Sequence, residues 1–188
     1  MTIRLIEHSS SNYAARTYHN ACGADLTAAF ALNFSTAGER LTRKAAGDRY
    51  VAIDLRLEAV DAARLLFAAA RNARAKMINI AGNSICTLAA GGWTQEGANA
   101  HLASVLSLVH QHWGIERILS GGQTGIDIAG IVAACHLGID ATATLPRGFR
   151  QRTIDRGDVS RSAEQIQAEV MAWSAQLASD RPSREAQR

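Results

Sequence analysis

The sequence of 188 residues holds only two prolines and three cysteines, few aromatic residues and no long hydrophobic run. The cysteines, Cys22, Cys86 and Cys135, are odd in number and widely spaced, which argues against a disulfide framework and against a structural zinc site. The six histidines show no HExxH or similar spacing, so no metal site is predicted. No apolar stretch reaches the roughly 18 residues of a membrane span, and no apolar leader opens the chain. These absences predict a soluble, reduced, cytoplasmic protein without a membrane partner.

Positive charge is scattered along the chain rather than clustered. The formal net charge is +3, no basic run is longer than two residues, and aromatic residues make up 5% of the sequence. Nucleic-acid surfaces need clustered Lys and Arg and, for single strands, aromatic platforms, so the composition argues against a nucleic-acid partner. A small bound anion would explain a few well-placed arginines equally well. The apolar fraction of 47% is typical of a compact globular protein with its own core.

Apolar segments of strand length alternate with amphipathic segments of helix length. Strands are predicted at 24–32, 50–55, 77–82, 117–120 and 141–146, and helices at 36–46, 58–75, 96–113, 126–137 and 161–178. Alternation of this kind predicts a doubly wound α/β fold, with a mainly parallel sheet and helices on both faces. Because no repeat or linker is visible, residues 1–178 are predicted to form a single domain, and 179–188 a polar tail.

The segment "SGGQTGID" follows a predicted strand, and ligands of open parallel sheets bind at the carboxyl ends of strands. Its glycines lack the Cβ atoms that would block close approach, and the unpaired N–H groups of the next helical turn favour an anion. Thr124 could donate a hydroxyl group or cap the helix, and Asp127 could favour the helix through its dipole alone. A tight turn without a ligand is the open alternative. The candidate phosphate-binding residues here are Gly121, Gly122, Gln123, Thr124, Gly125 and Asp127.

A second strand-to-helix junction reads "FSTAGERLT". Thr36, Gly38 and Thr42 could cap the helix or contact an anion. Glu39 is a candidate general acid or base, with Arg40 as a candidate charge stabiliser. The alternative for Glu39 is a first-turn carboxylate that the helix dipole favours.

Further candidates follow other predicted strands. Asp54 could bind a ribose hydroxyl or cap the next helix, and Asn83 could contact the polar part of a ligand. Arg147 offers a fork for phosphate or carboxylate. Arg150 and Arg152 are interpreted as a solvated basic loop.

The stretch "SGGQTGIDIAGIVAACHLGI" resembles the opening of the molybdenum-cofactor carrier proteins. These have a Rossmann-like fold and belong with the lysine-decarboxylase-like and LOG-like proteins, a superfamily often called SLOG. The next family strand ends in a Pro-Lys-Gly type of turn, here "TLPRGF". The family's Tyr, Arg-Thr, Asn and acid resemble Tyr13, Arg16, Thr17, Asn20 and Asp25, and its remaining segments resemble "STAGERLT", "VAIDL" and "INIAGN".

The segments stand in a rotated order, because the family begins with the segment that this chain reaches at residue 120. The resemblance covers roughly Tyr13 to Gly148 in two blocks. It implies a circular permutation with its break between the "LPRGF" loop and the "YAART" segment. Permutation is tolerated where chain ends are exposed and close together, so Ser10 is expected near Asp158 at one edge of the sheet.

The resemblance implies a nucleotide-derived or other phosphate-bearing ligand, such as a nucleotide or a molybdopterin-type cofactor, with Arg16 among the binding residues. The first functional hypothesis is therefore a small-molecule binding protein. The second is a hydrolase that cleaves the N-glycosidic bond of a nucleoside monophosphate, with Glu39 as acid or base and Arg40 or Arg16 as charge stabiliser. Its family motif, PGGxGTxxE, is not matched by "STAGERLT". The third is a non-catalytic interaction module or homo-oligomer, suggested by the alanine-rich stretch 62–70.

Overall fold

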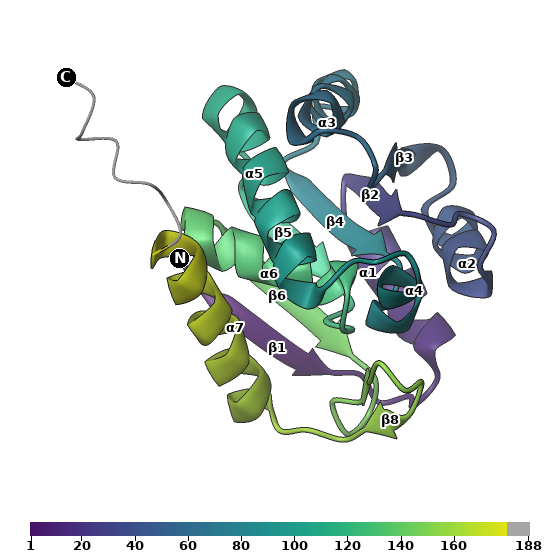
Figure 1. The fold of residues 1–188 in the computed structure, drawn as a ribbon. Coiled ribbons are helices and arrows are strands. Elements are labelled where there is room, and N and C mark those ends of the chain that lie inside the picture. Colours follow the sequence, from purple (N-terminus) through teal and green to yellow (C-terminus); the bar gives the residue numbers. More distant parts are fainter. Residues whose placement is uncertain (180–188) are drawn as a thin grey trace.

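Six strands form one parallel sheet in the order β1-β6-β5-β4-β2-β3 (Figure 1). The computed structural model describes residues 1–179. Every pairing in this sheet is parallel. Ile3–Glu7 pairs with Asp140–Leu145 at one edge, and Leu26–Ala31 pairs with Tyr50–Asp54 at the other. The strands are β1 (Ile3–Glu7), β2 (Leu26–Ala31), β3 (Tyr50–Asp54), β4 (Met77–Gly82), β5 (Arg117–Ser120) and β6 (Asp140–Leu145).

Helices cover both faces of the sheet, which confirms the doubly wound, single-domain α/β fold. The helices are α1 (Tyr13–Gly23), α2 (Ala37–Ala46), α3 (Ala59–Ala73), α4 (Ile85–Ala90), α5 (Gln95–Trp113), α6 (Ile126–Leu137) and α7 (Ala163–Ser179). α1 packs against α2, while α5 packs against α3 and α6, and α6 against α7. In Figure 1 the layer of α5, α6 and α7 lies in front of the sheet and α1 behind it. The helices change from one face to the other because the crossovers are right-handed. The connections from β1 to β2 and from β2 to β3 run in one direction along the sheet, and the connections from β3 through to β6 run in the other.

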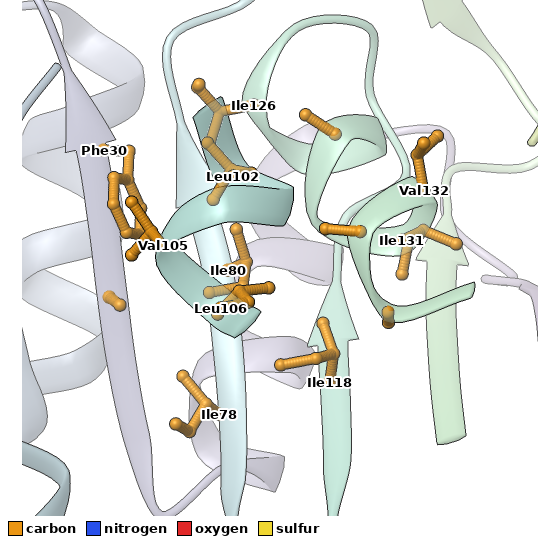
Figure 2. Close-up of a cluster of buried hydrophobic side chains, with 14 of the residues drawn as sticks. Phe30, Ile78, Ile80, Leu102, Val105, Leu106, Ile118, Ile126, Ile131 and Val132 are labelled. Atoms are coloured by element: carbon orange, nitrogen blue, oxygen red, sulfur yellow. The ribbon is translucent and has the colours of Figure 1, made fainter. Parts of the chain in front are cut away.

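The main core lies between the sheet and the layer of α5 and α6 (Figure 2). Ile78 and Ile80 of β4 meet Leu102 and Leu106 of α5, and all four side chains have no exposed surface. Burial of each such side chain stabilises the fold by about 1.5–3 kcal/mol. Gly130 lets α6 lie directly on the sheet, since a Cβ there would stand 2.7 Å from Ile80. α6 is therefore enclosed from Ile126 to Cys135.

Three alanines of α3 face inward, whereas Ala68 and Ala73 are exposed. Ala62, Ala63 and Ala70 are at most 5% exposed within the single chain. Packing inside the chain thus accounts for these small residues, and a homo-oligomer stays a prediction.

Several elements do not follow from the sequence patterns. β1, α1 and α4 were not among the predicted elements, nor was the hairpin of β7 (Gln151–Arg152) and β8 (Asp158–Val159). β1 is an edge strand whose burial does not alternate cleanly, and the hairpin strands have two residues each, so neither gives a periodic signal. The predicted strand 24–32 begins later, at Leu26, because the Asp25 carboxylate accepts hydrogen bonds from the backbone amides of Lys76 and Met77.

The segments around Ser10 and Asp158 lie close together, as the permutation hypothesis requires. The backbone amide of Arg147 donates to the Ser10 carbonyl oxygen over 3.1 Å. The Arg150 guanidinium donates to the Ser11 carbonyl oxygen at 2.9 Å and stands 3.9 Å from the Asp158 carboxylate. The permutation itself stays a prediction, because proximity is necessary for it but not sufficient.

The end of α7 at Ser179 lies one residue beyond the predicted domain boundary. The rest of the predicted polar tail, 180–188, lies outside the described residues. Among residues 1–179, no helix is both long enough and apolar enough to cross a membrane.

Candidate functional site: a polar cavity at the sheet's switch point

A cavity of about 500 Å³ opens at the carboxyl ends of β2, β4 and β5. α1 and the first turns of α2 line one side, and the ends of β4 and β5 line the other. The neighbours β2 and β4 send their connections to opposite faces of the sheet, which leaves a crevice between them. The cavity therefore occupies the place where doubly wound folds bind ligands.

A buried ion pair joins α1 to α6 at the cavity wall. The Arg16 guanidinium donates to the Asp127 carboxylate at 2.9 Å, and the two side chains are 10% and 8% exposed. Burial raises the pKa of Asp127, and Arg16 opposes that shift. The pair lies over Gly121, where a Cβ would stand 1.3 Å from the guanidinium. The first glycine of "SGGQTG" therefore makes room for a side chain of the same protein.

The other two glycines of this turn also accommodate protein atoms. Gly122 has φ +63°, and a Cβ there would lie 2.7 Å from Leu145. Gly125 has φ +95°, and a Cβ there would lie 2.4 Å from the Asn83 carbonyl oxygen. The Gly125 amide donates to Gln95 at 2.6 Å, and the Ile126 amide donates to the Asn83 carbonyl oxygen at 3.1 Å. The amides of Gly125 and Ile126 at this helix start are thus already bonded.

The β7–β8 hairpin covers the same turn. The Gln151 side-chain amide donates to the Gly122 carbonyl oxygen at 2.6 Å. The Thr124 hydroxyl donates to the Arg152 carbonyl oxygen, and the Arg152 amide donates to the Gln123 side chain. Thr124 does not cap α6, because the N-cap residue is Gly125. Gly121, Gln123 and Asp127 line the cavity, whereas Gly122, Thr124 and Gly125 do not.

The start of α2 differs from the start of α6 in the hydrogen bonding of its backbone amides. Thr36 is the N-cap residue, and its hydroxyl accepts from the Glu39 amide at 3.2 Å. Among the described residues, no group accepts a hydrogen bond from the amides of Ala37 and Gly38. A Cβ on Gly38 would meet nothing within 4 Å. Since Thr36, Ala37 and Gly38 line the cavity, α2 presents free N–H groups and the positive end of its dipole to it.

Glu39 is buried beside these amides. Its side chain lines the cavity, only 2% of the residue is exposed, and Oε2 has no hydrogen-bond partner within residues 1–179. Burial, and then the nearby Asp127 carboxylate, raise the pKa of Glu39 to about 8. The group is therefore mostly a neutral carboxylic acid at pH 7. Thr42, one turn further along, donates to the Gly38 carbonyl oxygen at 3.1 Å.

Three guanidinium groups surround the Tyr13 ring at the cavity mouth. Arg16, Arg150 and Arg152 lie 5.5, 5.7 and 5.3 Å from the ring centroid. Arg152 also pairs with Asp158 at 3.1 Å. Burial and the Asp158 carboxylate raise the pKa of Tyr13. The interpretation of Arg150 and Arg152 as a solvated loop is wrong, because both are half-buried and Arg152 lines the cavity.

Asn79 is a cavity residue that was not predicted. Asn79 lies in the apolar strand β4, is 3% exposed and lines the cavity. Its side-chain amide donates to the Thr27 hydroxyl at 3.2 Å, while its Oδ1 has no partner in the described part of the chain. A polar residue inside the run "MINIAG" is the signal that could have identified it.

The remaining predicted residues do not contribute free groups to the cavity. Asp54 pairs with Arg56 at 2.9 Å outside the cavity, and Arg40 is exposed and donates to the Ser35 carbonyl oxygen. Arg147 is exposed and outside the cavity as well. Asn83 lines it, but its side chain bonds the backbone of 32–33 and so holds the loop after β2.

No family model matches this sequence, and a search of curated proteins found no match. The resemblance to the SLOG proteins therefore stays a prediction, and the function is argued from the cavity itself. Within residues 1–179, no three His, Cys, Asp or Glu side chains are grouped so that they could hold a metal ion.

Proposed function

We propose that the protein binds a small phosphate-bearing molecule, of the nucleotide-derived kind, in this cavity. The observation that carries the proposal is the start of α2, where Ala37 and Gly38 line the cavity and their amides have no partners among the described residues. Free helical N–H groups with the helix dipole behind them form a general anion site. A molybdopterin-type cofactor belongs to the same class of ligand, since it carries a phosphate.

The charged pairs around the cavity do not oppose an anion. Arg16 is balanced by Asp127, and Arg152 by Asp158. Glu39 adds little negative charge below its raised pKa of about 8. An incoming phosphate therefore meets helix amides and two guanidinium groups without a facing free carboxylate.

Calorimetric titration with inorganic phosphate and nucleoside monophosphates tests the proposal. Arg152→Met removes a guanidinium at the mouth and is expected to weaken binding about tenfold, the loss of one charge-assisted hydrogen bond. Arg147→Met, at an exposed arginine outside the cavity, serves as the control and should bind like the wild type. The proposal fails if no phosphorylated compound binds, or if the two variants weaken binding equally.

The second candidate function is hydrolysis of an N-glycosidic bond, and the buried, protonated Glu39 favours it. A carboxylic acid that is neutral near pH 7 can donate a proton to a departing base. The bond between the sugar carbon and the base nitrogen would break, the base would leave with the Glu39 proton, and water would add to the sugar carbon and return a proton.

Release of free base from nucleoside monophosphates separates this candidate from binding alone. Glu39→Gln keeps the size and neutrality of the side chain but cannot donate a proton as an acid. Hydrolysis requires base release by the wild type, a decline of the rate above about pH 8, and loss of release in Glu39→Gln with binding retained. No release at high enzyme concentration would leave binding as the function.

A further inference from the structure

We propose that the inner part of the cavity recognises a hydroxylated ring, so that the ligand class is a sugar phosphate and a nucleobase adds little affinity. This inference rests on the proposed phosphate-binding function and specifies the non-phosphate part of the ligand.

Among the cavity-lining residues that the structure describes, four buried polar atoms lack partners: Tyr13 Oη, and a group of three that comprises Arg16 Nε, Glu39 Oε2 and Asn79 Oδ1. A buried polar group without a hydrogen bond costs about 1–3 kcal/mol, so the three atoms together favour a polar guest. Arg16 Nε is a donor, Asn79 Oδ1 an acceptor, and a protonated Glu39 can act as either. Hydroxyl groups both donate and accept, so neighbouring hydroxyls on a ring can satisfy this mixed set.

The cavity offers little aromatic surface for a flat base. Of its described lining residues, Tyr13 is the sole aromatic one, and the three guanidinium groups already surround its ring. The other apolar lining residues are Ala14, Ala37, Leu41 and Ala81, which present small aliphatic groups. Base–aromatic stacking contributes about 1–3 kcal/mol per base, and among the described lining residues only Tyr13 has an aromatic ring to supply it.

The phosphate and the sugar ring of such a ligand each have a matching position in the cavity. A phosphate fits the amides of Ala37 and Gly38, while Asn79 lies on β4, opposite Thr27 of β2 in the sheet register. A volume of about 500 Å³ lies within the range of small-molecule sites.

Calorimetry with four probes tests the inference: inorganic phosphate, ribose 5-phosphate, adenine and adenosine 5′-monophosphate. Ribose 5-phosphate is expected to bind at least about tenfold more tightly than phosphate, since each satisfied buried group contributes roughly 1 kcal/mol or more. Adenine alone should show no binding, and the nucleotide should bind within about threefold of ribose 5-phosphate. A nucleotide that binds more than about tenfold more tightly than ribose 5-phosphate, or binding of adenine, overturns the inference but leaves the proposed function standing. Absence of binding by every phosphorylated probe overturns both.

A pair of variants assigns the effect to Asn79. Asn79→Leu is expected to abolish the advantage of ribose 5-phosphate over phosphate while the affinity for phosphate stays unchanged. Thr27→Val is the matched control, because it breaks the same Asn79–Thr27 hydrogen bond but keeps Asn79 Oδ1. Equal loss of the sugar advantage in both variants would mean that Asn79 acts through packing alone, and would overturn its assigned role.

Discussion

Two strand-to-helix turns at the carboxyl edge of the sheet lead into helices through glycine, but the glycines of the two turns have different neighbours. The β5–α6 turn holds three glycines, and each glycine faces atoms of the protein itself. The β2–α2 turn leads to a single glycine, Gly38, which faces open space in the cavity. A glycine in such a turn indicates that another group lies close to the backbone, but that group can belong to the protein itself. The proposed function therefore assigns the anion to the helix start whose glycine has no packing partner.

The largest expected effect comes from the ion pair that closes the α6 turn. Arg16→Met leaves the Asp127 carboxylate buried without its partner, and we expect a loss of about 3–5 kcal/mol in the free energy of unfolding. Urea denaturation measures it. The double variant Arg16→Met/Asp127→Asn should recover part of the loss. A loss below about 1 kcal/mol in the single variant would mean that the pair does not hold this turn.

Alanine at Gly121 tests whether the glycine serves the protein. The added Cβ would overlap the Arg16 guanidinium, so we expect a loss of stability of about 1–3 kcal/mol by overpacking. The change should appear in thermal unfolding without any ligand present. Stability equal to the wild type would contradict the view that Gly121 is required for internal packing.

The pH dependence of stability tests the environment of Glu39. Its pKa rises from 4.5 to about 8 in the folded state, so between these values the folded chain holds a proton that the unfolded chain has released. Stability should therefore fall as the pH rises from about 5 to 8, by up to roughly 1.4 kcal/mol per pH unit. Tyr50, Arg43 and Asp127 are the other ionisable groups that interact with or neighbour this site.

Glu39→Gln should remove this contribution, and the difference between the two unfolding profiles isolates it. Matching slopes in wild type and variant over pH 5–8 would show that Glu39 titrates normally and would remove the support for an acid role.

The smallest expected effect on stability is at Gly38, and its sign is opposite to that at Gly121. Gly38→Ala places a methyl group in open space within a helix, so we expect stabilisation of up to about 0.5–1 kcal/mol. The same methyl group would obstruct the approach of an anion to the helix start, so phosphate affinity should fall. Thermal unfolding and calorimetry on one sample check both effects. Unchanged phosphate binding in this variant would place the anion elsewhere.

The sequence predicted the fold well where apolar runs are continuous. The bounds of β4, β5 and α6 agree with the patterns at 77–82, 117–120 and 126–137, because buried strands and an enclosed helix are rich in apolar residues. The hairpin of β7 and β8 could not be predicted, since its place depends on contacts such as that of Gln151 with Gly122.

The candidate site was predictable only in part. The strand-end argument located Gly38 and Glu39, and the family resemblance pointed to Arg16. The cluster of Tyr13 and Arg152 depends on packing between segments 139 residues apart, which no local pattern reports. The glycine turn was expected to seat the phosphate, but it is bonded within the protein, and only the three-dimensional contacts distinguish these two uses of glycine.

Titration of the ¹⁵N-labelled protein with inorganic phosphate, followed by the amide resonances of the two turns, tests the central claim most directly. If the anion binds at the start of α2, the amides of Ala37 and Gly38 should show the largest shifts, while those of Gly122 and Gly125 stay near their starting positions. Large shifts at Gly122 and Gly125 with none at Gly38 would contradict the account and return the anion to the glycine-rich turn.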